Sequence, residues 1–467
     1  MFAGIALCLF SPALLSGQET GLLRLDEKHR APRNEISLWS GIEDGRFRPI
    51  FEPYFQWSAG TEARLVRHGA HASWTGSISL EQKSGKYNRS SLFVEPDYFP
   101  MDLLDYTSGT GSRQTGRLET GFLADLSYLW AMGLNATIKA TNDSRRSAFR
   151  HSSFGMEAEL EPVLTFRSDD DACIVSSYLV RLRTERVKMD PSNVDAEGVL
   201  PFFFDKGMGY GASVYDPDQG IFPVLEFAHG FNEEYHSPEF SGGFGIVWKR
   251  GRAGDGDYSR FRFPGSTLKG FFETLREGFE VDRTYRISYQ RMRDQLREIL
   301  DSGDGYESDS DRVGRSVDFK VGFLPHKGVL KSITLDLDGN YWIESAAARV
   351  ISDQTQRLDA SATLLASLSM EDIDVDLNVM GGKGFWLDRG QVDNPLAQEV
   401  RLTENWLSKM EYYMAPRIGM GGALTYRFPA VEGLSLQLFG YWTRAFNATY
   451  LGGKNRETVT LKVEYNY

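Results

Sequence analysis

Four aspartates occupy alternate positions in two apolar stretches of the chain, and they are its clearest candidates for chemistry. Asp336 and Asp338 form one pair, and Asp374 and Asp376 form the other. Side chains two residues apart share one face of a β-strand, so each pair would present its carboxylates together. Such oxygen-rich sets can select cations or bind Ca²⁺. The alternative, which we favour, is a solvated wall neutralised by cations on neighbouring strands. The candidate cations are Lys320 and Arg286.

Two further clusters contain metal-ligating side chains without the spacing of a known site. His229 and His236 bracket two glutamates, but this is not the H-E-x-x-H spacing that places two ligands on one helix face. The acidic stretch 301–311 lacks the EF-hand pattern. We therefore predict no cofactor, with a loop-bound Ca²⁺ as the alternative. None of the seven His lies in a pattern typical of barrel hydrolases, so we predict no catalytic residues and no enzyme.

Apolar and polar residues alternate from end to end of the chain, which predicts that these side chains lie on β-strands. A two-residue turn predicts a hairpin in which Met370 pairs with Ile373, and the pairs above it are also apolar. A second hairpin is predicted with its turn at 131–133, so that Trp130 pairs with Leu134. Both registers place apolar residues together on one face.

The C-terminal segment 457–467 indicates what kind of sheet this is. It alternates strictly and ends in Tyr465 and Tyr467, and it resembles the last strand of Gram-negative outer-membrane barrels, whose terminal aromatic is an insertion signal. Charges at strand centres, alternately short and long connections, and aromatics at strand ends favour a transmembrane barrel over a soluble sandwich. We predict an all-β fold, a transmembrane antiparallel β-barrel of about 16 strands (14–18) with long extracellular loops.

The composition divides the chain into three parts. Residues 1–17 contain an apolar run followed by small residues, which predicts a secretory leader. Residues 18–34 would be a periplasmic N-terminal segment, and 35–467 the barrel. After the leader, Cys173 is the only cysteine, so no intramolecular disulfide can form. The net charge of −12 argues against a nucleic-acid partner.

The expected loop 187–238 is unusually aromatic. Aromatic side chains exposed at that density would be an interaction hazard. The loop is therefore expected to fold into the lumen as a plug, to bind a ligand or partner, or to pack on itself as a cap, and the sequence leaves these three open. Under the first interpretation, deleting 190–236 would raise permeability. The candidate residues are Phe202, Phe203, Phe204, Phe222 and Phe227.

A second resemblance rests on residues 85–109. This stretch is similar to an uncharacterised family of Gram-negative outer-membrane barrels, often encoded beside TonB-dependent receptors. That family shows Asp-Pro-Arg where this chain has Ser144-Arg145-Arg146. The resemblance implies a compartment and a context but no activity. The matching residues are Gly85-Lys86-Tyr87, Asp97-Tyr98-Phe99-Pro100, Leu104-Asp105 and Gly109.

Together these patterns predict an outer-membrane barrel that acts as a channel or transporter for small solutes. One alternative is a non-conducting barrel that anchors a surface complex with a TonB-dependent receptor or a surface lipoprotein. A barrel hydrolase is the third hypothesis. Outer-membrane lipid and the barrel-assembly machinery are expected partners under each of them.

Overall fold

The computed structural model covers most of the chain after the expected leader. The described residues are 34–48, 52–87, 90–105, 108–147, 151–168, 172–189, 202–206, 208, 211–213, 221–254, 260–299, 306–348, 351–390, 400–448 and 453–467. The predicted leader and almost all of the predicted periplasmic segment lie outside these residues.

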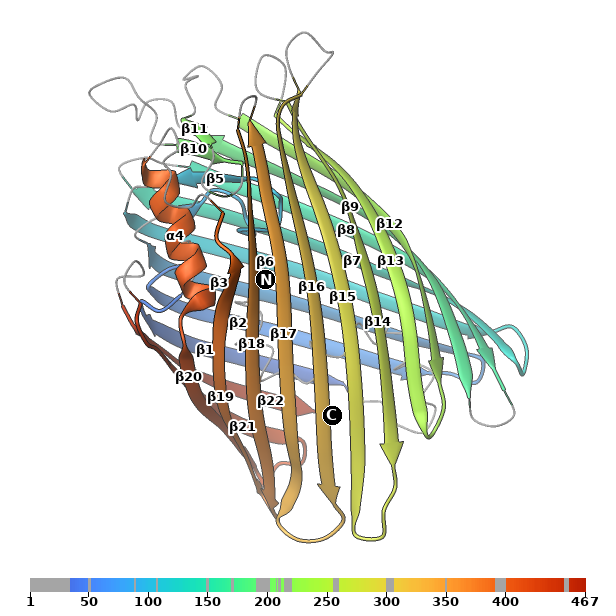
Figure 1. Cartoon of the computed structure of the whole chain (residues 1–467). Helices are drawn as coiled ribbons and strands as arrows, with labels where there is room; N and C mark the ends of the chain where they lie inside the picture. The colour runs from blue at the N-terminus through green and yellow to red at the C-terminus, as the bar shows by residue number, and fades with distance from the viewer. Residues whose placement is uncertain are drawn as a thin grey trace.

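Within the described residues, eighteen antiparallel strands form one closed barrel (Figure 1). Each strand pairs with its neighbours in chain order, and β1 pairs with both β2 and β22, which closes the ring. The barrel strands are β1 (Glu35–Gly45), β2 (Phe55–His68), β3 (Ala72–Tyr87), β6 (Gly109–Asp125), β7 (Trp130–Ser147), β8 (His151–Arg167), β9 (Cys173–Met189), β12 (Ile221–His236), β13 (Phe240–Ala253), β14 (Arg260–Arg276), β15 (Val281–Ile299), β16 (Tyr306–Pro325), β17 (Leu330–Ala348), β18 (Ile351–Met370), β19 (Ile373–Asp388), β20 (Arg417–Arg427), β21 (Leu434–Ala445) and β22 (Asn455–Asn466).

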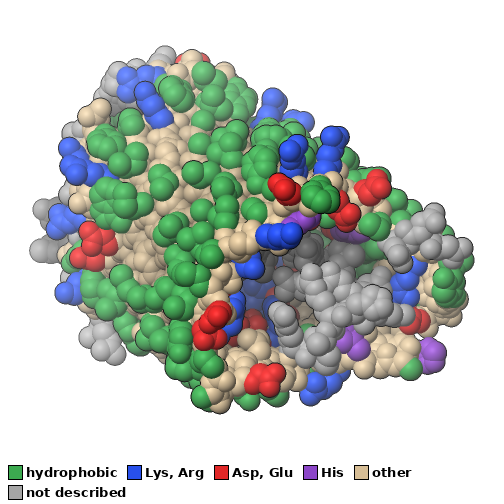
Figure 2. Space-filling model, turned by 90° about the horizontal axis from the view of Figure 1, so that it is seen from below, with side chains coloured by type: hydrophobic (Ala, Val, Ile, Leu, Met, Phe, Trp, Pro, Cys, Tyr) green, Lys and Arg blue, Asp and Glu red, His purple; other side chains and the backbone are tan. Residues whose placement is uncertain are grey.

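The two faces of the barrel differ in polarity, as the alternation predicted. On the outer face, Leu364, Leu377 and Leu461 are 50%, 51% and 46% exposed, whereas the inward Thr363 and Asn378 are buried and polar. Figure 2 looks onto the short-turn end and shows apolar side chains over the outer wall and charged ones around a hollow. A closed ring with an apolar exterior and a polar interior is the arrangement with which β-barrels span membranes. No helix among the described residues is long and apolar enough to do so.

The connections alternate in length between the two ends of the barrel. One end has short turns, such as Glu371-Asp372, and there β1 begins and β22 ends, with the Tyr467 N–H donating to the Asn34 carbonyl oxygen over 2.9 Å. Aromatic rings line this end, including Trp130 with Phe166 at a centroid distance of 4.9 Å. The other end contains the long connections, including those over 88–108, 190–220 and 389–416. This is the predicted pattern for an outer-membrane barrel.

The prediction of about 16 strands is wrong, because the barrel has 18 among the described residues. β12 lies inside the stretch 187–238 that was expected to be one loop. Its inward Phe222 and Val224 are apolar and 4% and 3% exposed. Residues 221–225, the first five of the strand, are therefore apolar on both faces and do not alternate. β14 is one strand, whereas the alternation predicts two weak strands over 257–264 and 268–277.

One predicted hairpin register is confirmed and the other is wrong. Met370 pairs with Ile373, as predicted. The second turn lies at 126–129, however, so Leu134 pairs with Phe122 rather than with Trp130. The difference between these two partners is eight residues, an even number, so each side chain keeps its predicted face.

Candidate functional site

Part of the chain between β3 and β6 folds into the lumen, and we call residues 90–105 the lumen segment. It contains two short strands, β4 (Ser90–Ser91) and β5 (Asp102–Asp105). These pair with β10 (Phe202–Asp205) and β11 (Gly211–Ser213) in a separate four-stranded sheet. In this sheet Leu103 lies opposite Phe204. The two long connections on either side of β6–β9 are therefore joined to each other by backbone hydrogen bonds.

Apolar side chains of the lumen segment pack onto apolar patches of the inner wall. Phe93 and Phe99 contact each other at 5.3 Å between ring centroids, and Phe99 lies 5.3 Å from Phe263 of β14. Each fully buried side chain of this size contributes roughly 1.5–3 kcal/mol. The lumen segment is therefore held by a core of its own. The buried members are Leu92, Phe93, Phe99, Met101, Leu103, Val187, Phe204, Phe222, Val224, Ala253, Phe261, Phe263 and Leu296.

Glu95 links the lumen segment to two strands of the wall. Its carboxylate accepts hydrogen bonds from Lys139 on β7 and from Arg183 on β9, the latter at 2.8 Å. The Arg183 guanidinium also lies 3.7 Å from the centre of the Tyr98 ring. Burial alone would raise the pKa of Glu95, but the charges and hydrogen bonds of Arg183 and Lys139 lower it to about 2. The carboxylate is therefore ionised at neutral pH.

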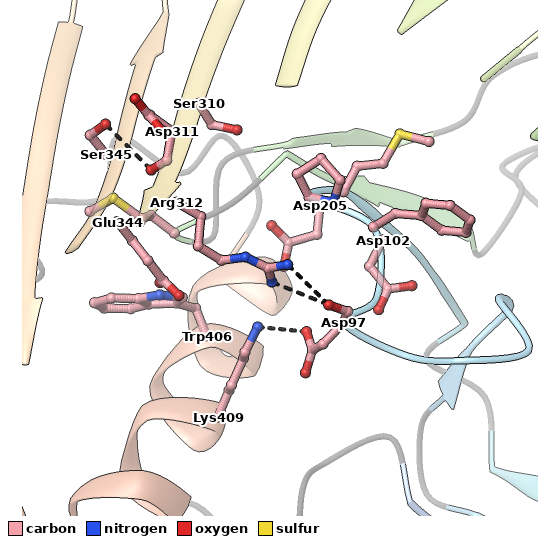
Figure 3. Close-up of a pocket in the computed structure, with 14 residues that line it drawn as sticks. Asp97, Asp102, Asp205, Ser310, Asp311, Arg312, Glu344, Ser345, Trp406 and Lys409 are labelled. Atoms are coloured by element: carbon pink, nitrogen blue, oxygen red, sulfur yellow. Dashed lines mark hydrogen bonds and ion pairs between the residues drawn. The ribbon is translucent and has the colours of Figure 1, made fainter. Parts of the chain in front are cut away.

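Asp97 makes the contacts on the opposite side of the lumen (Figure 3). Its carboxylate accepts a hydrogen bond of 2.6 Å from Lys409, and its carbonyl oxygen accepts two of 3.2 Å from Arg312 of β16. Although burial opposes it, the positive charge of Lys409 lowers the pKa of Asp97. The backbone of Asp97 has φ 63°, a left-handed conformation that Asp tolerates better than most residues.

Lys409 belongs to α4 (Val400–Met414), a helix that packs against the inner wall. The Arg357 guanidinium of β18 lies 4.4 Å from the centre of the Tyr413 ring, and Trp386 of β19 lies 6.1 Å from Trp406. Asp97 thus joins three elements: the lumen segment, α4 and β16.

The position of these contacts shows how far the lumen segment reaches. It leaves the wall at β3 and contacts β16, and counting β6, β7, β8, β9, β12, β13, β14, β15 and β16 gives nine steps around the 18-strand ring. Nine of 18 steps is half the circumference. The lumen segment therefore crosses the barrel from one wall to the opposite one.

A chamber of about 600 Å³ borders the lumen segment. Tyr98 closes part of it, donating a hydrogen bond of 2.6 Å to Glu226 and accepting one of 3.1 Å from Arg181. Seven Lys or Arg and five Asp or Glu side chains line this chamber, including Lys269 of β14 and Glu159 of β8. Such a lining suits a polar or charged solute rather than an apolar one.

The six residues predicted to face the lumen all lie on the inward face, but they do not form one cluster. Lys320 lies 3.1 Å from Asp336, and Arg286 lies 3.4 Å from Glu273. Asp336 and Asp338 lie beside Asp318, a residue the sequence analysis missed. Finding it required the β16–β17 register, which places Asp318 opposite Asp338.

The other predicted pair lies apart from these residues. Asp374 forms an ion pair with Arg427, and Asp374 and Asp376 line a second cavity of about 580 Å³ at the short-turn end. The role of the predicted carboxylates in selectivity stays a prediction.

The aromatic residues expected in the loop 187–238 separate into different environments. Phe204 and Phe222 belong to the buried core around the lumen segment. Phe202 and Phe203 lie on β10, and their side chains lie outside what the structure describes. Phe227 is 45% exposed on the outer face of β12, so it does not lie in a loop that plugs the lumen, and its role in partner binding stays a prediction.

The remaining candidates that the structure describes lie apart from one another. His229 stacks with outward-facing rings such as Trp248 at 5.5 Å, whereas His236 lies 3.1 Å from the inward Glu234, so the two His point to opposite faces. Asp301 and Asp304 lie outside the described residues. A loop-bound Ca²⁺ and the absence of catalysis both stay predictions. Tyr465 and Tyr467 stack at 5.8 Å at the end of β22, where an insertion signal is expected.

The chain matches no family model and no curated protein. Its fold is similar to solved structures of large outer-membrane barrels. The FrpB iron transporter from Neisseria meningitidis (F5-1 variant, apoprotein) has a TM-score of 0.46 and 10% identity over 95% of this chain and 82% of that one. The ferric-catecholate import receptor Fiu from E. coli K12 has a TM-score of 0.41 and 9% identity over 94% and 82%.

A third similar structure is BauA, the ferric preacinetobactin receptor from Acinetobacter baumannii, with a TM-score of 0.41 and 9% identity over 94% of this chain and 80% of that one. At these identities and TM-scores the similarity assigns neither a family nor a substrate to this chain. The expected membership in an uncharacterised family beside TonB-dependent receptors stays a prediction. Of the residues that carry that resemblance, Asp97, Tyr98, Phe99, Pro100, Leu104 and Asp105 lie in the lumen segment.

Proposed function

We propose that this protein is an outer-membrane channel or transporter for small polar solutes, in which the lumen segment forms the constriction. The observation that carries the proposal is the path of residues 90–105 from β3 to the opposite strand β16. A barrel of 16 or 18 strands encloses enough space for water unless loops fill it. Whatever passes must therefore move beside the lumen segment or displace it.

The contacts of the lumen segment suggest how passage is controlled. An apolar core shared with β9 and β12–β15 holds it, as does Glu95 through β7 and β9, whereas its described contacts to β16 and α4 are polar and centre on Asp97. Polar contacts in a wet lumen exchange with water more easily than apolar packing does. The Asp97 side is therefore the part of the lumen segment we expect to move.

Single-channel recording of the refolded mature protein in a planar bilayer tests this proposal. We expect small, brief steps for the wild type and larger or longer ones for Lys409→Met, which removes the partner of the Asp97 carboxylate. Lys331→Met is the matched control, because it also removes one positive charge from the lumen but lies at the short-turn cavity. Equal conductance of Lys409→Met and the control would show that the lumen segment is not the constriction.

A non-conducting barrel that anchors a TonB-dependent receptor or a surface lipoprotein is the second proposal. It is supported by the apolar core that holds the lumen segment across the barrel. A protein that inserts but gives no steps in either form, together with co-purification of a partner, would favour it. The deletion that tests partner binding must end before Ile221, since the stretch 190–236 contains β12 and its removal would open the ring.

A further inference from the structure

Three inward-facing carboxylates converge on the inner wall of β16 and β17. One oxygen of each of Asp318, Asp336 and Asp338 lies within 4.8 Å of the other two. Asp318 and Asp338 are direct cross-strand partners, and Asp336 is the partner of Lys320. Like charges placed directly opposite each other destabilise a sheet, so this arrangement requires compensation.

The cations nearby compensate only part of this charge. Lys320 lies 3.1 Å from Asp336 and 3.9 Å from Asp318. Arg286, the cross-strand partner of Lys320, lies beside Glu273 at 3.4 Å. Three carboxylates and one ammonium group have a net charge of −2, which one divalent cation would neutralise.

Buried carboxylate oxygens without a hydrogen-bond donor give a second, independent indication that a cation binds to this cluster. Asp336 is only 5% exposed, and its Oδ1 is buried without a hydrogen-bond donor in the part of the chain that the structure describes, while Oδ2 of Asp318, also without a donor there, has Lys320 as its nearest cation at 3.9 Å. A buried carboxylate oxygen without a donor or cation costs free energy. Two other oxygens of the cluster are oriented by hydroxyl groups, because Ser288 donates to Asp318 Oδ1 and Ser361 to Asp338 Oδ2, both over 3.4 Å.

We propose that Asp318, Asp336 and Asp338 form a Ca²⁺ site on the lumen wall. Ca²⁺ takes oxygen ligands at about 2.3–2.6 Å, so two ligands on opposite sides of the ion are about 4.6–5.2 Å apart. The three oxygens can therefore reach one Ca²⁺ with little movement. Mg²⁺ binds at about 2.0–2.1 Å and would require the cluster to contract. Water in the lumen would supply the remaining ligands.

Calorimetric titration of the refolded full chain in detergent with CaCl₂ tests the site. We expect one Ca²⁺ per chain and weaker binding of MgCl₂. Asp338→Asn and Asp318→Asn should each weaken Ca²⁺ binding by about tenfold or more, because each removes a charged ligand. Asp376→Asn is the matched control, since it removes a lumen carboxylate at the short-turn cavity and should leave binding unchanged.

Two results would overturn the proposal. One is that wild-type protein, shown to be folded by its heat-dependent gel migration, takes up no Ca²⁺ while Asp338→Asn raises its Tm, which would mean that the carboxylates share protons instead. The other is that Asp376→Asn weakens binding as much as the cluster variants. Binding is read without any transport, so this test is independent of the conductance experiment.

Discussion

Single charged residues hold the lumen segment, and each is shared between several partners. Arg183 contacts Glu95 at 2.8 Å and lies 3.6 Å from Glu157, while its guanidinium covers the Tyr98 ring. Sharing one cation among several groups offsets the cost of removing charges from bulk water. Glu95 and Arg183 are 88 residues apart in sequence. No local pattern could have paired them, and this part of the site was not predictable from sequence.

The ion pairs of Glu95 lead to a pH prediction. The folded pKa of about 2 lies below the ordinary value of 4.5, so these pairs add stability that is fully present above pH 4.5. That stability is lost as the pH falls from 4.5 towards 2. Asp97, whose pKa is also lowered, acts in the same direction. We expect acidification through this window to loosen the lumen segment and increase single-channel conductance.

The control for this prediction is Glu95→Gln, which cannot ionise. Its conductance at pH 7 should already exceed that of the wild type, and its response to acid should be smaller. An identical acid response in both proteins would assign the effect to other carboxylates.

At the scale of strands, the sequence predicted most of the barrel because alternation and short turns are local signals. The register of the β18–β19 hairpin was predicted correctly, with Met370 opposite Ile373. β12 was missed because its inner face is apolar where it covers the lumen segment, which removes the alternation. β14 was divided because of Pro264, which lacks an N–H and interrupts the pairing with β15 between Arg262 and Gly265. The error at β12 thus has a cause in tertiary packing, and the error at β14 has one in the covalent structure of proline.

Gly251 of β13 gives a prediction about how the wall accommodates the apolar core. It pairs with Phe263, whose ring lies over it, and a Cβ at this position would overlap that ring. We expect Gly251→Ala to lower the free energy of unfolding by about 1–3 kcal/mol, measured by urea titration in vesicles. Gly440→Ala should be close to neutral, because nothing lies within 4 Å of the added Cβ. Similar losses in both variants would indicate a general cost of replacing strand glycines.

At the scale of the whole molecule, the sequence could not say which loop enters the lumen. The stretch 187–238 was considered for that role because of its aromatics, but residues 90–105 cross the barrel, and in the described part of the other stretch β10 and β11 pair with them while Phe222 packs against them. Both connections are rich in apolar residues, and composition does not distinguish a loop that folds inward from one that caps the barrel. The direction is decided by contacts between distant residues, such as Lys409 with Asp97, 312 residues apart.

The orientation of the wall towards lipid leads to the last prediction, which uses two neighbouring residues of β19. Leu377 faces outward and is 51% exposed, whereas Asp376 lines the lumen cavity. An arginine on the lipid face near the middle of the bilayer costs about 2–4 kcal/mol, because the charge cannot be solvated there. Leu377→Arg should therefore lower the urea midpoint of the vesicle-inserted protein strongly. Asp376→Arg adds the same side chain to the wet lumen and should change it little. If the two variants lost equal stability, β19 would not have lipid on one side and water on the other.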